Sequence, residues 1–439
     1  MTETVDQLLH ARWIIPVVPE NQALEHHTLA IKDGRIHAIL PTPEANRTFQ
    51  AEQEKELPGH ALMPGLINTH THAAMSLLRG LADDLPLMSW LNDHIWPAEG
   101  KWVSEEFIQD GSQLAIAEML LGGTTCFNDM YFFPDVTGRV ADAAGIRAVV
   151  GLIALDFPTV WAADGEEYLH KGLQVHDQFR NNPLVHTAFA PHAPYSVADP
   201  VLERVRILSD ELEIPVHIHL HETNDEIIQG LQHHDCRPME RLQRLGLLSP
   251  SLMAVHMTHL AEGEIDTFAA SGGHVVHCPE SNLKLASGFC PVNRLLNAGI
   301  NVALGTDGAA SNNDLDMFSE MHTAALLAKG VAEDASALPA AKALSMATIN
   351  GARALGLEAE TGSLELGKSA DLIAVDLNRL QTQPIYHPIS HLVYATGKEQ
   401  VREVWVAGRH LVSEGILMTL DQTRLLERAT YWRERIAES

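Results

Sequence analysis

Eight apolar runs of strand length recur through the middle of this chain, and each is followed by a stretch with helical composition. Alternating strands and helices imply parallel pairing, and uninterrupted apolar runs imply strands that are covered on both faces. A chain of 439 residues exceeds what one hydrophobic core usually holds, unless that core is a barrel. The sequence therefore predicts an α/β fold, a (β/α)8 TIM barrel, with strands inside residues 62–72, 124–130, 147–155, 185–192, 215–222, 252–259, 274–281 and 301–308.

The two ends of the chain differ from its middle in their pattern of apolar and polar residues. Residues 27–40 alternate apolar and polar positions around Asp33-Gly34, a dipeptide typical of tight hairpin turns. Similar short strands return at 370–377 and 401–412. We therefore expect both ends to pair into one small β-sandwich domain with the barrel inserted between its halves. The expected boundaries are 1–60 and 365–420 for the sandwich, 61–364 for the barrel and 421–439 for a C-terminal surface helix.

The charge and the cysteines narrow the classes of partner and compartment. The chain has 30 basic and 57 acidic residues, hence a formal net charge of −27. This balance argues against nucleic acid or an anionic membrane as a partner, because phosphate groups are bound by basic patches, but it permits a neutral small molecule. Four cysteines without a Cys-x-x-Cys pair indicate a reducing compartment. With neither a signal peptide nor an apolar run of about 18 residues, a cytoplasmic protein is expected.

Polar side chains gather at the carboxyl-terminal end of almost every apolar run. Among 25 histidines, a His-x-His pair such as His70/His72 can arise by chance. A chance scatter would not prefer one end of the strands, however, and barrel enzymes carry their active sites at the carboxyl ends. The polar residues at these ends are His70, His72, Asn128, Asp129, His192, His219, Glu222, His256 and Asp307.

Three of these strand ends suit a metal ion. Residues two apart on a strand point to the same side, so His70 and His72 can both face the barrel axis. The last run ends with Asp307 between Thr306 and Gly308. Three imidazoles and one carboxylate make a site for Zn²⁺ or Fe²⁺ with a position left open for water. The alternative is a polar core in which the histidines are only hydrogen-bonded. The fifth run offers three histidines of one parity, His217, His219 and His221.

Four stretches carry a family resemblance: "PGLINTHTH" (64–72), "HLHE" (219–222), "HCPESNLKL" (277–285) and "GTDGAASNN" (305–313). They resemble the amidohydrolase superfamily and, within it, the deaminases of 5'-methylthioadenosine and S-adenosylhomocysteine. The resemblance runs over the whole chain. It implies one divalent metal, Zn most readily and Fe as the alternative, on the ligands His70, His72, His219 and Asp307.

The resemblance also implies the catalytic groups. The family's catalytic glutamate falls on Glu222, and its strand-six histidine falls on His256, for which His259 is the local rival. His217 and His221 would then support or pack around the site. Binuclear members carry a lysine at the end of strand four, and residues 185–195 contain none, so a single metal is expected.

Hydrolytic deamination needs an activated water and groups that transfer protons, and these residue types can supply both. A divalent metal lowers the pKa of water, which then attacks the carbon bearing the amino group. Glu222 would protonate the neighbouring ring nitrogen, Asp307 would carry a proton to the departing ammonia, and His256 would orient the nucleophile. The plainer interpretation makes Glu222 a first-turn residue of the following helix and Asp307 a simple turn residue. The other zinc deaminase plan needs Pro-Cys-x-x-Cys, which this chain lacks.

The resemblance extends to the substrate pocket. It places a pocket-lining tryptophan at Trp90, a ribose-binding glutamate at Glu99 and a substrate-contacting histidine at His192. The alternatives are an exposed acidic residue for Glu99 and a supporting role for His192. Members that accept the homocysteine tail use arginines near strand three, where this chain has Leu152. Apolar side chains could cover a methylthio group there, so 5'-methylthioadenosine is favoured over S-adenosylhomocysteine; these are Phe157, Val160 and Trp161.

Two other classes of function stay open at this point. One is a different hydrolase on the same scaffold, such as a triazine chlorohydrolase or a deaminase of guanine or cytosine, and Glu99 distinguishes it because these substrates have no ribose. The other is a metal-binding scaffold without catalysis, which both acid–base candidates argue against. The sequence leaves open whether the chain forms a homo-oligomer.

Overall fold

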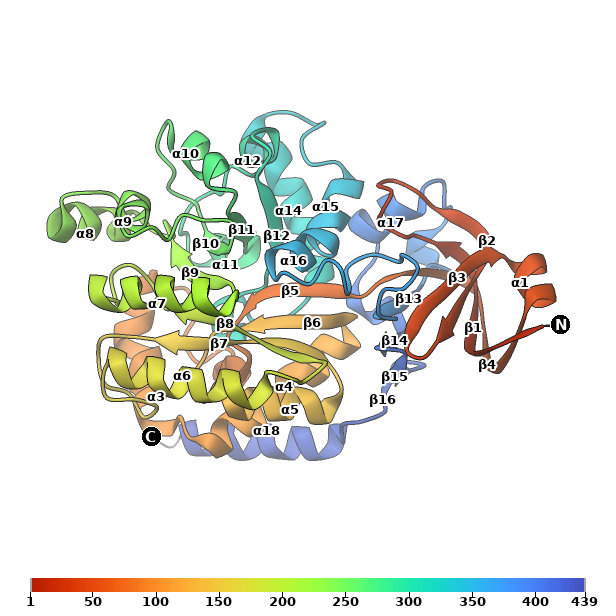
Figure 1. The fold of residues 1–439 in the computed structure, drawn as a ribbon, viewed down its shortest axis with the longest axis horizontal. Coiled ribbons are helices and arrows are strands. Elements are labelled where there is room, and N and C mark those ends of the chain that lie inside the picture. Colours follow the sequence, from red (N-terminus) through yellow and green to blue (C-terminus); the bar gives the residue numbers. More distant parts are fainter. Residues whose placement is uncertain (1, 438–439) are drawn as a thin grey trace.

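A computed structural model describes residues 2–437 of the chain (Figure 1). All eight predicted runs form strands of one parallel sheet, in which each strand pairs with the next in sequence order, from β5 to β12. The predicted (β/α)8 barrel is confirmed. Its strands are β5 (Leu66–Thr71), β6 (Thr124–Asp129), β7 (Arg147–Ala154), β8 (Val185–Pro191), β9 (Val216–Leu220), β10 (Leu252–His256), β11 (His274–His277) and β12 (Asn301–Leu304).

The sheet curls until its last strand lies beside its first. Thr69 Oγ1 in β5 donates to the Leu304 carbonyl of β12 at 2.6 Å. Just beyond the strand end, the Asp307 amide donates to the His70 carbonyl at 2.9 Å. These bonds bring the ends of β5 and β12 together. Residues that are far apart in sequence, such as His70 and Asp307, thereby become neighbours.

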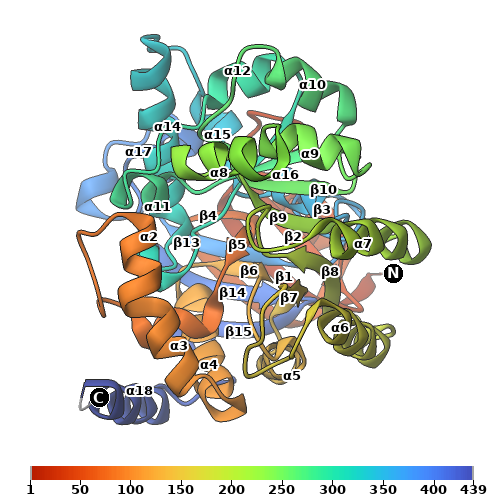
Figure 2. The same ribbon diagram turned by 90° about the vertical axis from the view of Figure 1, so that its left-hand side faces the viewer.

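Helices surround the barrel strands, as the view in Figure 2 shows. Several begin at a side-chain cap: Ser104 accepts from the Phe107 amide, and Asp164 accepts from the Glu167 amide. Their apolar faces pack on the strands and form one large core. The main helices between strands are α4 (Glu105–Leu121), α5 (Pro134–Ala144), α6 (Gly165–Phe179), α7 (Asp199–Leu212), α8 (Asn224–His234), α9 (Pro238–Arg244), α10 (Glu264–Ser271), α11 (Pro279–Lys284), α12 (Val292–Asn297), α14 (Met317–Ala332), α15 (Ala340–Met346) and α16 (Ile349–Ala354).

Both chain ends form a second sheet, in the order β16-β15-β14-β13-β4-β1-β2-β3. The predicted hairpin turn is present: Asp33 and Gly34 have φ of 52° and 72°. A Cβ on Gly34 would lie 2.6 Å from the Ala407 carbonyl oxygen, so only glycine fits here. The strands are β1 (Glu3–Ile14), β2 (Leu24–Lys32), β3 (Arg35–Pro41), β4 (Phe49–Pro64), β13 (Leu372–Asp376), β14 (Val401–Val406), β15 (Arg409–Ser413) and β16 (Ile416–Leu417), with α1 (Thr42–Thr48) before β4. The exact domain boundaries stay predictions.

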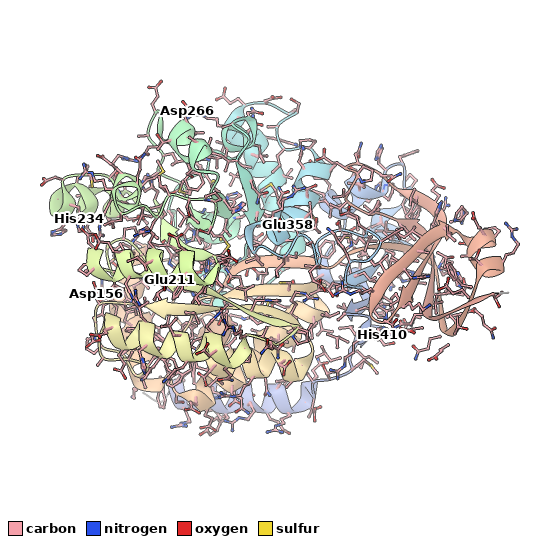
Figure 3. All side chains as sticks on the ribbon, viewed as in Figure 1. Asp156, Glu211, His234, Asp266, Glu358 and His410 are labelled. Atoms are coloured by element: carbon pink, nitrogen blue, oxygen red, sulfur yellow. The ribbon has the colours of Figure 1, made fainter. Side chains whose placement is uncertain are left out.

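The second sheet adjoins the amino ends of the barrel strands. Arg147, the first residue of β7, donates from Nε to Asp371 Oδ2 at 2.8 Å, and both side chains are fully buried. In Figure 3, His410 of β15 and Asp156, which follows β7, lie toward opposite ends of the molecule. The carboxyl ends of the barrel strands therefore open away from the second sheet.

The predicted C-terminal helix is α18 (Gln422–Ala437). It covers the barrel by burying Leu425 and Trp432, and Trp432 Nε1 donates to Asp110 Oδ2 of α4 at 2.8 Å. Most of its other residues are exposed, as expected for a surface helix. Within residues 2–437, no helix combines the length and the apolar character that a membrane crossing demands.

Candidate metal centre and substrate pocket

The four predicted metal ligands come together at the carboxyl end of the barrel. One ligand atom from each of them lies within 4.8 Å of all the others. The closest approaches are 3.2 Å each: His70 Nε2 and His72 Nε2 to Asp307 Oδ1, and His219 Nε2 to His70 Nε2. Ligands at about 2.0–2.1 Å from a tetrahedral zinc are separated by about 3.3 Å, so the spacing suits one cation between them.

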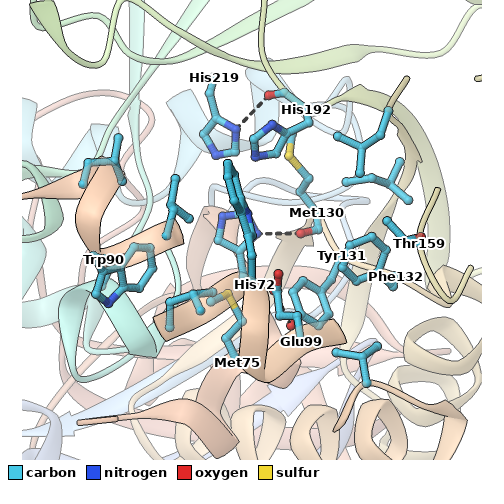
Figure 4. A pocket seen from close by; sticks show the side chains of 18 of the residues that line it. His72, Met75, Trp90, Glu99, Met130, Tyr131, Phe132, Thr159, His192 and His219 are labelled. Carbon is cyan, nitrogen blue, oxygen red and sulfur yellow. Dashed lines mark hydrogen bonds between the residues drawn. The ribbon is translucent and has the colours of Figure 1, made fainter. Parts of the chain in front are cut away.

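Backbone carbonyls orient two of the histidines. His72 Nδ1 donates to the Met130 carbonyl at 2.5 Å, and His219 Nδ1 donates to the His192 carbonyl at 2.8 Å (Figure 4). With the proton on Nδ1, each Nε2 turns its lone pair toward the shared centre, which is the arrangement that metal-ligating histidines need. His70 is held from behind by His217, whose Nε2 lies 2.9 Å from His70 Nδ1. The donor set therefore fits a divalent metal.

Asp307 is a carboxylate in this setting. Burial alone would raise its pKa, but hydrogen bonds from His70 and His72 hold the pKa of Asp307 well below its usual range. Its second oxygen, Oδ2, accepts from Ser281 Oγ at 2.6 Å and from Ser311 Oγ at 2.9 Å. Its backbone is left-handed, with φ of 63°, which bends the chain at the strand end. One oxygen thus faces the histidines while the other is fixed by hydroxyls.

His70 and His72 differ in protonation. Burial lowers the pKa of His70 to about 4, so this imidazole is neutral. Burial opposes a charge on His72 as well, but the adjacent Asp307 raises the pKa of His72 to about 9. A metal ion that binds at this centre would have to displace a proton from His72.

Glu222 and His256 face each other beside the metal centre. Glu222 lies just beyond β9, and its Oε2 is 3.8 Å from His256 Nε2 at the end of β10. Burial raises the pKa of Glu222 above the usual range of a carboxyl group. His256 Nδ1 donates to Asn282 Oδ1 at 2.8 Å, which fixes the ring with Nε2 toward Glu222. The rival His259 instead donates from Nε2 to the Ser287 carbonyl and does not line the cavity.

A cavity of about 460 Å³ opens over these groups. Trp90, Glu99, His192 and Glu222, which were predicted to bind the substrate, line it, and Figure 4 shows several of them around one space. The cavity combines an inner polar end at the metal centre with apolar walls from loops. The predicted site residues on its wall are His72, Trp90, Glu99, His192, His219, Glu222, His256 and Asp307, while His70 lies buried behind them.

Tyr131 is a pocket residue that sequence reasoning missed. Its hydroxyl donates to Glu99 Oε1 at 2.7 Å and joins the loop after β6 to α3 (Trp96–Trp102). Burial raises the pKa of Glu99 to about 7, and the hydrogen bond from Tyr131 opposes that rise. Tyr131 follows the polar strand end Asn128-Asp129 by two residues. This position just beyond a barrel strand was the sequence signal by which Tyr131 could have been found.

A family model described as the amidohydrolase family matches residues 61–411, which is most of the chain. The chain belongs to the amidohydrolase family. This amidohydrolase is 53% identical over 431 residues to a 5-methylthioadenosine/S-adenosylhomocysteine deaminase of Saccharophagus degradans, covering 98% of this chain and 97% of the relative.

Solved structures agree with the fold of the amidohydrolase. A zinc-bound adenosine deaminase from Xanthomonas campestris superposes with a TM-score of 0.99 at 52% identity, and each chain is covered in full. An atrazine chlorohydrolase from Arthrobacter aurescens superposes with a TM-score of 0.91 over 97% of this chain and 99% of its own. At 22% identity, the second likeness shows the shared fold alone.

One sequence interpretation of the pocket needs correction. Leu152 points away from the cavity of the amidohydrolase toward α6, where a Cβ on Gly172 would meet it at 3.2 Å. Trp161 does not line the cavity either, because it packs on Phe133 with ring centroids 5.0 Å apart. Phe157 and Val160 do line it, and no arginine or lysine is among the described residues on the wall. The expectation that the carboxylate of a homocysteine tail meets no basic side chain therefore depends on the residues of the whole cavity wall and not on Leu152.

Proposed function

We propose that this amidohydrolase is a metal-dependent hydrolytic deaminase of adenine nucleosides, with 5'-methylthioadenosine as the favoured substrate. The observation that carries the proposal is that Glu222 and His256 face the same cavity as the four-residue metal centre. The names of two relatives, 5-methylthioadenosine/S-adenosylhomocysteine deaminase and adenosine deaminase, support the same substrate class. S-Adenosylhomocysteine and adenosine are the other substrates to compare.

The metal we propose is zinc. His70, His72, His219 and Asp307 would hold it, since three imidazoles and a carboxylate are ligands that zinc prefers. A relative that is 52% identical binds zinc. When bound, the ion would supply Lewis acidity and lower the pKa of a water in the cavity.

The chain's own residues would move the protons. Water adds to the ring carbon that bears the amino group, and negative charge develops on the adjacent ring nitrogen. Glu222, whose pKa is raised by burial, holds a proton at neutral pH more readily than an exposed carboxyl group does and donates it to that nitrogen. Asp307 accepts a proton from the attacking water and passes it to the amino group, which leaves as ammonia, and the remaining hydroxyl proton returns to Glu222 as the ring carbonyl forms. His256, fixed by Asn282, orients the water beside Glu222.

The outer pocket would select the sugar and its 5' substituent. Glu99 would accept hydrogen bonds from the ribose 2'- and 3'-hydroxyls, with its carboxylate fixed by Tyr131. Phe157 and Val160 provide apolar surface for a methylthio group. The carboxylate of a homocysteine tail would find no arginine or lysine among the described residues on the wall, so its desolvation would not be offset.

The decisive experiment compares ammonia release from five compounds: methylthioadenosine, adenosine, S-adenosylhomocysteine, guanine and cytosine. The proposal expects the highest kcat/KM for methylthioadenosine. A clear preference for guanine or cytosine would overturn the substrate class. Absence of ammonia release from all five by metal-loaded protein would favour a non-catalytic metal-binding scaffold. The cytoplasmic location and a homo-oligomeric assembly stay predictions.

A further inference from the structure

Glu226 departs from the hydrogen bonding that its sequence position suggests. The pattern Thr223-x-x-Glu226 at the start of α8 matches a capping box, and Thr223 Oγ1 indeed accepts from the Glu226 amide at 3.3 Å. In a capping box the glutamate side chain would reach back to the amide of the cap residue. Here Oε1 accepts from the His221 amide at 2.9 Å, and Oε2 accepts from the Glu222 amide at 2.8 Å. Glu226 thus holds the segment before the helix.

Thr258 holds the same segment from its other side. Its hydroxyl lies 2.6 Å from the Glu222 carbonyl oxygen and 3.0 Å from the His221 carbonyl oxygen. Its backbone amide also donates to the His221 carbonyl at 3.0 Å. Thr258 follows His256, the last residue of β10, by two residues. The amide and carbonyl groups around Glu222 are therefore fixed by two side chains from different elements.

This segment needs such support because its backbone is bent. His221 has φ of 55°, a left-handed conformation that non-glycine residues rarely adopt. The bend breaks the strand alternation that leads from His219 and turns Glu222 into the cavity, opposite His256. Both Glu226 and Thr258 are buried, so water does not readily replace their hydrogen bonds.

We propose that Glu226 and Thr258 are positioning residues that clamp the His221–Glu222 segment and so hold the Glu222 carboxyl group against His256. The catalytic part of this proposal rests on the proposed deaminase function. The structural part does not depend on any activity. The clamp acts on the acid and not on the metal, because His219 is anchored separately by its bond to the His192 carbonyl.

The test uses two substitutions that remove one hydrogen-bonding group each. Glu226→Gln replaces an accepting oxygen by an NH₂ group, which cannot accept from a backbone amide. Thr258→Val removes the hydroxyl at nearly constant shape, and Thr258→Ser retains it. Glu403→Gln is the matched control, because it removes a buried carboxylate from β14 in the second sheet.

We expect Glu226→Gln and Thr258→Val to lower kcat for methylthioadenosine by about ten- to a hundredfold, since a misplacement near 1 Å can cost about a hundredfold. KM should stay within about twofold and bound metal should be unchanged. Thr258→Ser should restore most of kcat, and Glu403→Gln should leave it unaltered. Hydrogen exchange measured by mass spectrometry should become faster in the peptide that spans 219–225 in both clamp variants.

A second set of variants shows whether the clamp acts through Glu222. In a Glu222→Gln background, adding Glu226→Gln or Thr258→Val should change kcat by less than about twofold, because coupled residues are not additive. An equal loss in both backgrounds, a rise in KM alone, or full activity with unchanged exchange would overturn the proposal. If wild-type protein releases no ammonia from any adenine nucleoside, the proposed function fails, while the exchange experiment still decides the clamp.

Discussion

Replacing Tyr131 by phenylalanine should shift the pH at which nucleoside binding weakens. In the proposed site the ionised Glu99 accepts the ribose hydroxyls, and burial raises its pKa to about 7. The Tyr131 hydroxyl donates to Glu99 at 2.7 Å and favours the ionised form. Without that donor, the pKa of Glu99 should rise further, and the protonated, poorly binding form should persist to higher pH.

The size of the shift follows from one charge-assisted hydrogen bond. Such a bond contributes about 1.5–3 kcal/mol, and one pKa unit corresponds to about 1.36 kcal/mol, so the pKa should rise by about one to two units. Binding is strong above the pKa of Glu99 and is lost as the pH falls through it. The variant should therefore show a normal KM only at a pH about one to two units higher than wild type. A bound cation would lower the pH midpoint of KM in both the wild type and the variant, and the difference between the two midpoints would stay the same.

The assay is ammonia release from methylthioadenosine with KM and kcat measured from pH 5 to 9. We expect the Tyr131→Phe variant to show the shifted KM profile with kcat changed little at high pH. Tyr394→Phe on α17 (Pro388–Tyr394) is the control and should leave both profiles in place. An unshifted or downward-shifted KM midpoint would refute the reasoning, and so would a loss confined to kcat.

Three further results are expected. Asp371→Asn leaves the buried Arg147 guanidinium unpaired and should lower the free energy of unfolding in urea by about 3–5 kcal/mol; a loss below about 1 kcal/mol would contradict this. Glu222→Gln should reduce kcat by about 10²–10⁴-fold at unchanged metal content, and near-normal turnover would exclude Glu222 as the proton donor. Exhaustive chelation should abolish ammonia release and added Zn²⁺ should restore it, whereas full activity of metal-free protein would remove the metal from the proposal.

The strand positions and the pair His70 and His72 could be predicted from the sequence because both depend on local patterns. The buried parallel strands read as continuous apolar runs, and the spacing of His70 and His72 places both side chains on one face. Leu152 shows where this reasoning ends. Adjacent residues of a strand face opposite sides, so an offset of one position separates Leu152, against α6, from Ile153 on the cavity wall.

Loops and long-range contacts were not accessible in this way. Trp161 is apolar and close to the pocket in sequence, yet the loop turns it onto Phe133. Tyr131 gains its partner only because α3 brings Glu99 against the end of β6. The capping pattern at Thr223 correctly predicts a helix start, but it does not reveal that Glu226 binds the two amides of the preceding bend.

The sequence by itself determined the barrel, the paired chain ends and the candidates His70, His72 and Asp307, because periodicity and strand-end position are properties of neighbouring residues. The family resemblance supplied the choice of His219 among the three histidines of the fifth run. Only the tertiary structure decided which side chains meet: the closure of β12 on β5 that joins Asp307 to His70, and the packing that sets Tyr131 on Glu99. The physical reason is that hydrogen bonds and charges act over a few ångströms. Residues distant in the chain reach that range only after the core has packed.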